Sequence, residues 1–287
     1  MKAISFIINT NLYIAFAAVC LTVASQVQLG MHPQLKAYLA VIFFASLLDY
    51  NAHRLITVGS MPEAFRSEKY QWSATHLPLL KMMLVFAAGG LAGTLLLTGI
   101  KILFVLAPLA ILSMLYSLTV SGKLKRNFRL QKIPFLKTFL IALVWTSATV
   151  ILPGMLSDHS PGIYQVLLVA IERFTFIFAI AIPFDIRDIK TDLLCGINTI
   201  PVAVGEKKAI LISNATLLLS MAIAVIHYHQ QNLGFIIPAY LFSSAATLIF
   251  INSHKLKKLT LYHHGILDGC LLLHGILISI SFFFQFN

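Results

Sequence analysis

The sequence predicts an all-α, polytopic membrane protein that forms a single domain over residues 1–287. Hydrophobic residues make up 59% of the chain and charged residues only 11%, and the mean hydropathy is +0.87. This composition is too apolar for a soluble domain of this length. Apolar stretches long enough to cross roughly 30 Å of hydrocarbon recur throughout, and none alternates with the period of a barrel strand. Because every backbone polar group in lipid needs an internal partner, these stretches are predicted to be helices.

About nine stretches of roughly 20 residues, the length that a bilayer requires, are predicted to be transmembrane helices. In order they are residues 4–27, 34–55, 79–97, 101–120, 134–152, 163–183, 209–228, 233–251 and 265–286. The first stretch follows Lys2, as in a secretory signal, but it is longer than a typical signal core and similar segments follow it. We therefore expect it to be retained as the first helix.

The connections between these helices alternate between long basic loops and short loops with few cations. The basic residues near the exits of the second, fourth, sixth and eighth helices are Arg66, Lys69, Lys123, Lys125, Arg126, Arg129, Lys132, Arg187, Lys190, Lys207, Lys208, Lys255, Lys257 and Lys258. The positive-inside rule then predicts that the N-terminus and the basic loops are cytoplasmic and that the C-terminus is outside. We expect an integral protein of a bacterial inner (plasma) membrane.

The net charge of +11 does not indicate a nucleic-acid partner, because the basic residues lie in loops between membrane segments. The three cysteines, Cys20, Cys195 and Cys270, are scattered and indicate neither a disulfide framework nor a thiolate site. The histidines at 227, 229, 263 and 264 have no carboxylate neighbour in the sequence, and we expect them at the membrane interfaces.

Three aspartates gather where the sixth predicted helix leaves the membrane. Asp185, Asp188 and Asp192 are spaced at i, i+3 and i+7, so they share one face if the segment is helical. Three like charges on one face repel each other, and a bound cation would remove that repulsion. Asp49 lies 136 positions before Asp185, about the length of four helices with their loops, which indicates two four-helix pseudo-repeats around a central cavity.

This aspartate segment and the residues after it resemble a known motif. The run from Phe184 to Asp192 and the following Gly-Ile-Asn-Thr-Ile-Pro from Gly196 resemble the second aspartate motif of the UbiA superfamily of intramembrane prenyltransferases. The resemblance continues in Tyr116-Ser117 followed by Lys123-Leu-Lys125-Arg126, and in the segment from residue 134 to 145. With the helix count, it covers essentially the whole chain.

The resemblance implies transfer of a polyprenyl group from its diphosphate to a small lipophilic or aromatic acceptor within the membrane. Mg²⁺ would be the cofactor, and its ligands would be Asp185, Asp188, Asp192 and Asp49. A leaving diphosphate needs divalent cations and fixed basic groups to absorb its charge, and carboxylates suit a hard cation. The expected diphosphate-binding residues are Arg54, Lys123, Lys125, Arg126, Arg187 and Lys190. The expected partners are a polyprenyl diphosphate donor, the acceptor and membrane lipid.

The first aspartate motif, after the second predicted helix, departs from the family pattern NxxxDxxxD. Asp49 stands at the Asn position, and His53 and Thr57 stand where the two acids are expected. The three share a helical face, but imidazole is a poor Mg²⁺ ligand. Three hypotheses remain open. Asp49 and His53 act in a reduced role beside the second motif, the chain binds an isoprenoid without turnover, or His53 is an ordinary polar residue at a helix end.

Several further polar residues are candidates for the substrate pocket, namely Tyr116, Asn51, Arg173 and Asp268. Glu172 and Arg173 lie near the middle of the sixth helix, where charges usually face a cavity or one another, and a structural bond to another helix is the alternative. Asp268 either lines the acceptor pocket or joins two helices. The ring of Tyr116 either stabilises a developing cation or belongs to the interfacial aromatic belt.

Two functions from other classes remain as alternatives. One is a non-catalytic isoprenoid-binding protein, and the other is a membrane transporter with a charged cytoplasmic vestibule. The discriminating observation is whether the exits of the second and sixth helices converge over one pocket lined by Asp49, His53 and the aspartates.

Overall fold

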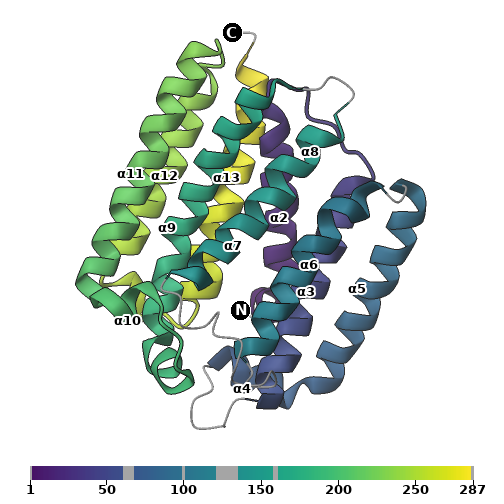
Figure 1. The fold of residues 1–287 in the computed structure, drawn as a ribbon, viewed down its shortest axis with the longest axis vertical. Coiled ribbons are helices and arrows are strands. Elements are labelled where there is room, and N and C mark those ends of the chain that lie inside the picture. The colour runs from purple at the N-terminus through teal and green to yellow at the C-terminus, as the bar shows by residue number, and fades with distance from the viewer. Residues whose placement is uncertain (1, 61–67, 99–100, 121–134, 158–160, 286–287) are drawn as a thin grey trace.

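A computed structural model describes residues 2–60, 68–98, 101–120, 135–157 and 161–285, and these residues form a bundle of helices (Figure 1). The α-helices are α1 Lys2–Asn9, α2 Leu12–Gln28, α3 Tyr38–Ser60, α4 Glu68–Thr75, α5 Leu77–Thr98, α6 Lys101–Val120, α7 Leu136–Thr146, α8 Leu152–Met155, α9 Ile163–Cys195, α10 Ile200–Val204, α11 Glu206–Gln230, α12 Ile236–Asn252 and α13 Asp268–Ser281. Short π-helical segments, Ser147–Ile151 and Tyr262–Leu267, join α7 to α8 and lead into α13.

The predicted all-helical membrane architecture is confirmed, whereas the number of spans differs from a simple count of nine. Within the described residues, six helical segments are long and apolar enough to cross a membrane, and the number is seven if the bent pair α1–α2 counts as one span. The apolar helices Ile102–Ser113 and Ile236–Asn252 are shorter. They correspond to the fourth and eighth predicted spans. Since neither is long enough to count as a spanning helix, a total of nine crossings stays a prediction.

The first predicted span is not one straight helix. The chain breaks between α1 and α2, where Asn11 adopts a left-handed conformation with φ of 65° and the two helix axes differ by 72°. Asparagine tolerates this conformation better than most residues, because its side chain hydrogen-bonds locally. The break turns α1 toward α4 and exposes backbone carbonyl groups, which become hydrogen-bond acceptors for α3.

Helix α9 runs through the middle of the bundle and packs against α7 and α11, while α2 packs against α13 and α3 against α5 (Figure 1). Its 33 residues correspond to roughly 50 Å at 1.5 Å per residue, well beyond a hydrocarbon thickness of about 30 Å. The sixth predicted span therefore ends too early at residue 183, because the helix continues through Asp185 and Asp192 to Cys195. The aspartates lie on its last turns.

The glycine after the aspartates determines where α9 stops. Gly196 has a φ of 69°, a left-handed conformation that glycine adopts without steric cost. The backbone N–H of Ile197 then donates to the carbonyl oxygen of Asp192 at 2.8 Å. The chain turns into the short helix α10, which lies with α4 at the same end of the bundle in Figure 1.

Another glycine sets how closely α2 and α13 pack. A Cβ atom on Gly275 would lie 2.7 Å from the carbonyl carbon of Cys20 and 2.8 Å from the backbone nitrogen of Leu21. Small residues allow such backbone contact between membrane helices, where lipid supplies no hydrophobic driving force for association. This contact brings α13, and with it Asp268, against the first helices.

Candidate active site

A cavity of about 250 Å³ opens between α3, α4, α6, α7, α9 and α13. The apolar part of its wall comes mainly from Leu112, Leu140, Ile141, Val144, Ile177, Ile180, Ala181, Phe184 and Leu271. Its polar and charged residues are Asp49, His53, Arg54, Lys69, Tyr70, Ser113, Lys137, Asp185, Arg187, Asp188, His264 and Asp268. The exits of α3 and α9 therefore converge on one cavity, which is the arrangement required for an enzyme site.

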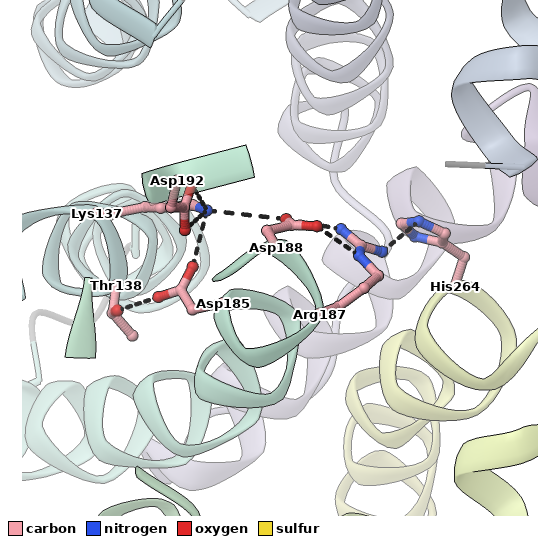
Figure 2. A network of polar contacts seen from close by, with 7 residues as sticks. All are labelled: Lys137, Thr138, Asp185, Arg187, Asp188, Asp192 and His264. Carbon is pink, nitrogen blue, oxygen red and sulfur yellow. Dashed lines mark hydrogen bonds and ion pairs between the residues drawn. The ribbon is translucent and has the colours of Figure 1, made fainter. Parts of the chain in front are cut away.

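The three aspartates of α9 surround one cation, the ammonium of Lys137 in the first turn of α7 (Figure 2). Lys137 Nζ lies 2.9 Å from Asp185 Oδ1, 3.8 Å from Asp188 Oδ2 and 3.3 Å from Asp192 Oδ2. Asp185 and Asp192 are buried, with residue exposures of 1% and 3%. The helical register thus places the carboxylates as the sequence predicts, and α7 supplies the positive charge between them.

Two carboxylates of this aspartate triplet, those of Asp185 and Asp188, have further polar partners. Thr138 Oγ1 donates to Asp185 Oδ2 at 2.6 Å. Arg187 makes a two-pronged contact with its neighbour Asp188, with Nε donating to Oδ1 at 2.7 Å and a terminal nitrogen donating to Oδ2 at 3.0 Å. The other terminal nitrogen of Arg187 lies 3.0 Å from His264 Nε2, as Figure 2 shows. Arg187 therefore links α9 to the segment that leads into α13.

The first aspartate motif lies on α3 and contributes Asp49 and His53 to the wall of the cavity. Asp49 lines the cavity and accepts a hydrogen bond from Ser113 Oγ of α6 at 2.7 Å. His53 lies one turn further along and also lines the cavity. Thr57 is buried, and its hydroxyl donates a hydrogen bond of 2.8 Å to the backbone carbonyl oxygen of His53 in the same helix.

Arg54 has a structural role that the sequence does not predict. Its guanidinium donates to the carbonyl oxygen of Asn9 and to the side-chain oxygen of Asn11, at the break between α1 and α2. Asn51, expected in the substrate pocket, instead joins the same region. It is fully buried, donates to the carbonyl oxygen of Thr10 at 3.2 Å and does not line the cavity.

The remaining charges of the cavity come from α4 and from the start of α13. Asp268 lines the cavity, with its Oδ2 3.5 Å from Nδ1 of His264, as one of its two sequence hypotheses requires. Burial, together with Arg54 and Arg187, lowers the pKa of Lys69 well below 10.5, and Asp268 partly opposes this shift. Burial, with Asp188 nearby, raises the pKa of the neighbouring Tyr70 phenol above its usual value.

Other expected site residues lie elsewhere. Arg173 is buried away from the cavity, and its guanidinium donates to Ser25 and Gln28 of α2. Lys190 lies on the exposed side of α9, outside the cavity wall. The side chain of Tyr116 and the residues Lys123, Lys125 and Arg126 lie outside what the structure describes. His264 lines the cavity, and His227 is buried with its Nδ1 2.6 Å from Oε1 of Glu172, while the expected interfacial depth of the histidines stays a prediction.

The donor set suits a hard divalent cation. Mg²⁺ prefers carboxylate oxygens, and carboxylate oxygens of all three triplet members lie within 4 Å of one cationic atom. Among the described residues, however, no group of three or more metal-ligating side chains is arranged as a ready metal site. The residues therefore fit Mg²⁺ in donor type, and the Lys137 ammonium occupies the position between the three carboxylates.

Comparison with known proteins identifies the chain. The UbiA prenyltransferase family matches residues 74–261, well over half of the sequence. The chain belongs to the UbiA prenyltransferase family. The match spans α7 and the aspartate triplet and begins after Asp49 and His53, the part of the chain where the motif departs from the family pattern.

Two solved structures share the fold at low sequence identity. A digeranylgeranylglyceryl phosphate synthase has 13% identity and a TM-score of 0.56, with 99% of this chain and 98% of that chain covered. A UbiA homologue from Aeropyrum pernix K1 has 14% identity and a TM-score of 0.59, with 98% of each chain covered. No curated protein matches the sequence at a significant level. Family and fold thus agree on a membrane prenyltransferase architecture.

Sequence reasoning missed several residues that other helices bring to the cavity or to its aspartates. Lys137, Thr138, Ser113 and Lys69 all line the cavity or contact its aspartates. One signal was present. Lys137 is a cation within an otherwise apolar predicted span, where a charge is costly unless it has a partner.

Proposed function

We propose that this chain transfers a polyprenyl group from its diphosphate to a small lipophilic or aromatic acceptor inside the membrane, with Mg²⁺ held by Asp185, Asp188 and Asp192. The observation that carries this proposal is the convergence of Asp185, Asp188, Lys137 and the α3 residues Asp49 and His53 on one cavity with an apolar wall, while Asp192 contacts Lys137 from outside the cavity lining. Family membership supports prenyl transfer as the class of reaction.

The residues divide into those that bind charge and those that bind the chain of the donor. Lys137 and Arg187 lie beside the carboxylates, where they can donate to phosphate oxygens once these are present. When bound, Mg²⁺ would neutralise the charge that builds up on the leaving diphosphate. Ile177, Ile180 and Val144 give the prenyl chain an apolar wall away from water.

In the reaction the C–O bond between the prenyl carbon and the diphosphate breaks, the acceptor bonds to that carbon, and the acceptor loses a proton. Tyr50 and Trp145 bring aromatic rings to the cavity, and Trp145 Nε1 donates to the Tyr50 hydroxyl at 3.1 Å. A ring face stabilises a nearby cation, and a dry apolar wall keeps water from capturing it. These two rings therefore suit the developing allylic cation.

The first test is the substitution Asp185→Asn, which keeps the size of the side chain and removes its charge. We expect kcat/KM for transfer from a labelled prenyl diphosphate to a panel of acceptors to fall by at least about 100-fold, because one carboxylate ligand is lost. Glu206→Gln, an exposed acid at the start of α11, is the matched control and should retain activity. Full activity in Asp185→Asn would contradict the proposed metal site.

A second candidate function is isoprenoid binding without turnover. The observation in its favour is the α3 motif, where His53 and Thr57 replace the acids of the family pattern and Thr57 bonds to the backbone. The same assay separates the two functions. Saturable binding of a prenyl diphosphate without product, across the acceptor panel and with Mg²⁺ or Mn²⁺, would favour the binding protein.

A further inference from the structure

The oxygens of the triplet already have partners among the groups of the protein, although two cations, Lys137 and Arg187, face three carboxylates. Asp185 has one oxygen on Lys137 at 2.9 Å and the other on Thr138 at 2.6 Å. Both oxygens of Asp188 accept from Arg187, and both oxygens of Asp192 lie 3.3 to 3.4 Å from Lys137 Nζ. The oxygens that a metal would use are therefore engaged with protein donors.

Lys137 differs from the other partners of the triplet because its side chain is long and flexible enough to move its ammonium away from the carboxylates. Thr138 is a short side chain fixed to α7, and Arg187 is held on its far side by His264 at 3.0 Å (Figure 2). Lys137 carries its charge on four flexible methylene groups, lines the cavity and keeps 16% of its side chain exposed. Its ammonium can swing from the carboxylates into the cavity without any change in the helices.

A divalent cation and the Lys137 ammonium cannot both sit among the same oxygens. Two positive charges about 3 Å apart repel strongly in a partly buried site, where water screens them poorly. A diphosphate in the cavity would offer the ammonium a partner of higher negative charge than a carboxylate. Once the ammonium moves there, the aspartate oxygens become available for the metal.

We infer that Lys137 is an internal counterion that occupies the metal position of the triplet and transfers to the donor diphosphate when it binds, so that diphosphate and metal bind cooperatively. The inference rests on the proposed function, because it takes the triplet as the metal site. It predicts weak metal binding to the protein alone. By linkage, the diphosphate raises the metal affinity by the same factor as the metal raises the diphosphate affinity.

The test measures Mn²⁺ bound to the purified full chain by electron paramagnetic resonance. Mn²⁺ replaces Mg²⁺ as a probe because it accepts the same oxygen ligands. Without diphosphate, Lys137→Met should bind Mn²⁺ at least about tenfold more tightly than the wild type, the scale of one lost competing charge. Lys208→Met removes an exposed lysine from the first turn of α11 and should match the wild type.

In a second experiment the same Mn²⁺ titration is repeated with inorganic pyrophosphate present. The free Mn²⁺ concentration is corrected for the Mn²⁺ that pyrophosphate binds in solution. The wild type should then gain about tenfold in protein-bound Mn²⁺ affinity, and Lys137→Met should gain much less, because it has no ammonium to relocate. If Lys137→Met does not fold, Lys137→Gln and the pyrophosphate response of the wild type alone give the answer.

Equal Mn²⁺ affinity in the wild type and in folded Lys137→Met would overturn the inference. So would the absence of any pyrophosphate effect in the wild type. Either result, together with measurable prenyl transfer, would leave the proposed function standing. If no variant binds Mn²⁺ and no transfer occurs, the metal assignment of the proposed function fails, and this inference fails with it.

Discussion

Single residues decide how the charges of the cavity are balanced. The aspartate triplet could be predicted from spacing, because i, i+3 and i+7 positions share a helical face. Lys137 could not be predicted as its partner, since local spacing does not tell which neighbouring helix faces α9. The same holds for Ser113, which donates to Asp49 from α6. In each case the partner comes from a different helix.

Lys69 gives a prediction on pH dependence. Its lowered pKa means that, between that value and 10.5, the unfolded chain binds more protons than the folded protein. Stability rises with pH in such a window, so the cost of burying this ammonium is largest at lower pH and disappears near 10.5.

The substitution Lys69→Met should therefore raise the thermal unfolding temperature at neutral pH. The difference in unfolding temperature between Lys69→Met and the wild type should shrink as the pH rises toward 10.5. In that range the wild-type lysine loses its proton, so the cost of burying its charge disappears. The measurement is thermal unfolding in detergent of both proteins from neutral to alkaline pH, with exposed Lys81→Met of α5 as the control. A difference that is independent of pH would contradict the assigned pKa direction.

At the scale of elements, α9 is the helix that holds the bundle together. Besides the triplet it carries Glu172 and Arg173, which point to different neighbours. Glu172 accepts from Tyr228 and lies 2.6 Å from Nδ1 of His227, both on α11. Arg173 reaches Gln28 of α2 at 2.6 Å, and Gln28 in turn donates to the Tyr228 hydroxyl at 2.6 Å. A continuous polar chain thus connects three helices inside the membrane.

This polar chain predicts a coupling between two adjacent residues that do not bond directly to one another. Arg173→Met should lower stability by about 1–3 kcal/mol, because buried acceptors on α2 lose a charged donor. The double variant Glu172→Gln/Arg173→Met should be less destabilised than the sum of the single variants, by roughly 0.5 kcal/mol or more. Unfolding in detergent measures both effects. Strict additivity would mean that the chain does not connect the two side chains energetically.

At the scale of the whole molecule, the cavity end of the bundle carries α4 and α10, and the C-terminus lies at the opposite end (Figure 1). The outer faces are apolar. Leu35 and Leu96, for example, are 91% and 87% exposed. Such faces are stable in contact with lipid, as expected of an integral membrane protein. The orientation of the bundle in the membrane follows only from the distribution of basic residues.

Labelling with a membrane-impermeant maleimide tests that orientation. In a background without native cysteines, Gln231→Cys after α11 should react in intact cells. Lys258→Cys after α12 should react only after permeabilisation, because the basic loops are expected in the cytoplasm. Both positions are exposed in the structure. The reverse pattern would place the cavity on the outside and contradict the predicted topology.

Composition and periodicity were enough to predict an all-helical membrane protein and the face on which Asp185, Asp188 and Asp192 gather, because both depend on local chain geometry in lipid. The family resemblance was also available, and the match to residues 74–261 confirms it. The partners of the site residues were determined by the packing of helices that are far apart in the sequence. It put the Lys137 ammonium among the aspartates and added Asp268 to the cavity, while Arg173 and Asn51 went to structural hydrogen bonds. Such pairings depend on which helices are neighbours, and that is a property of the whole fold.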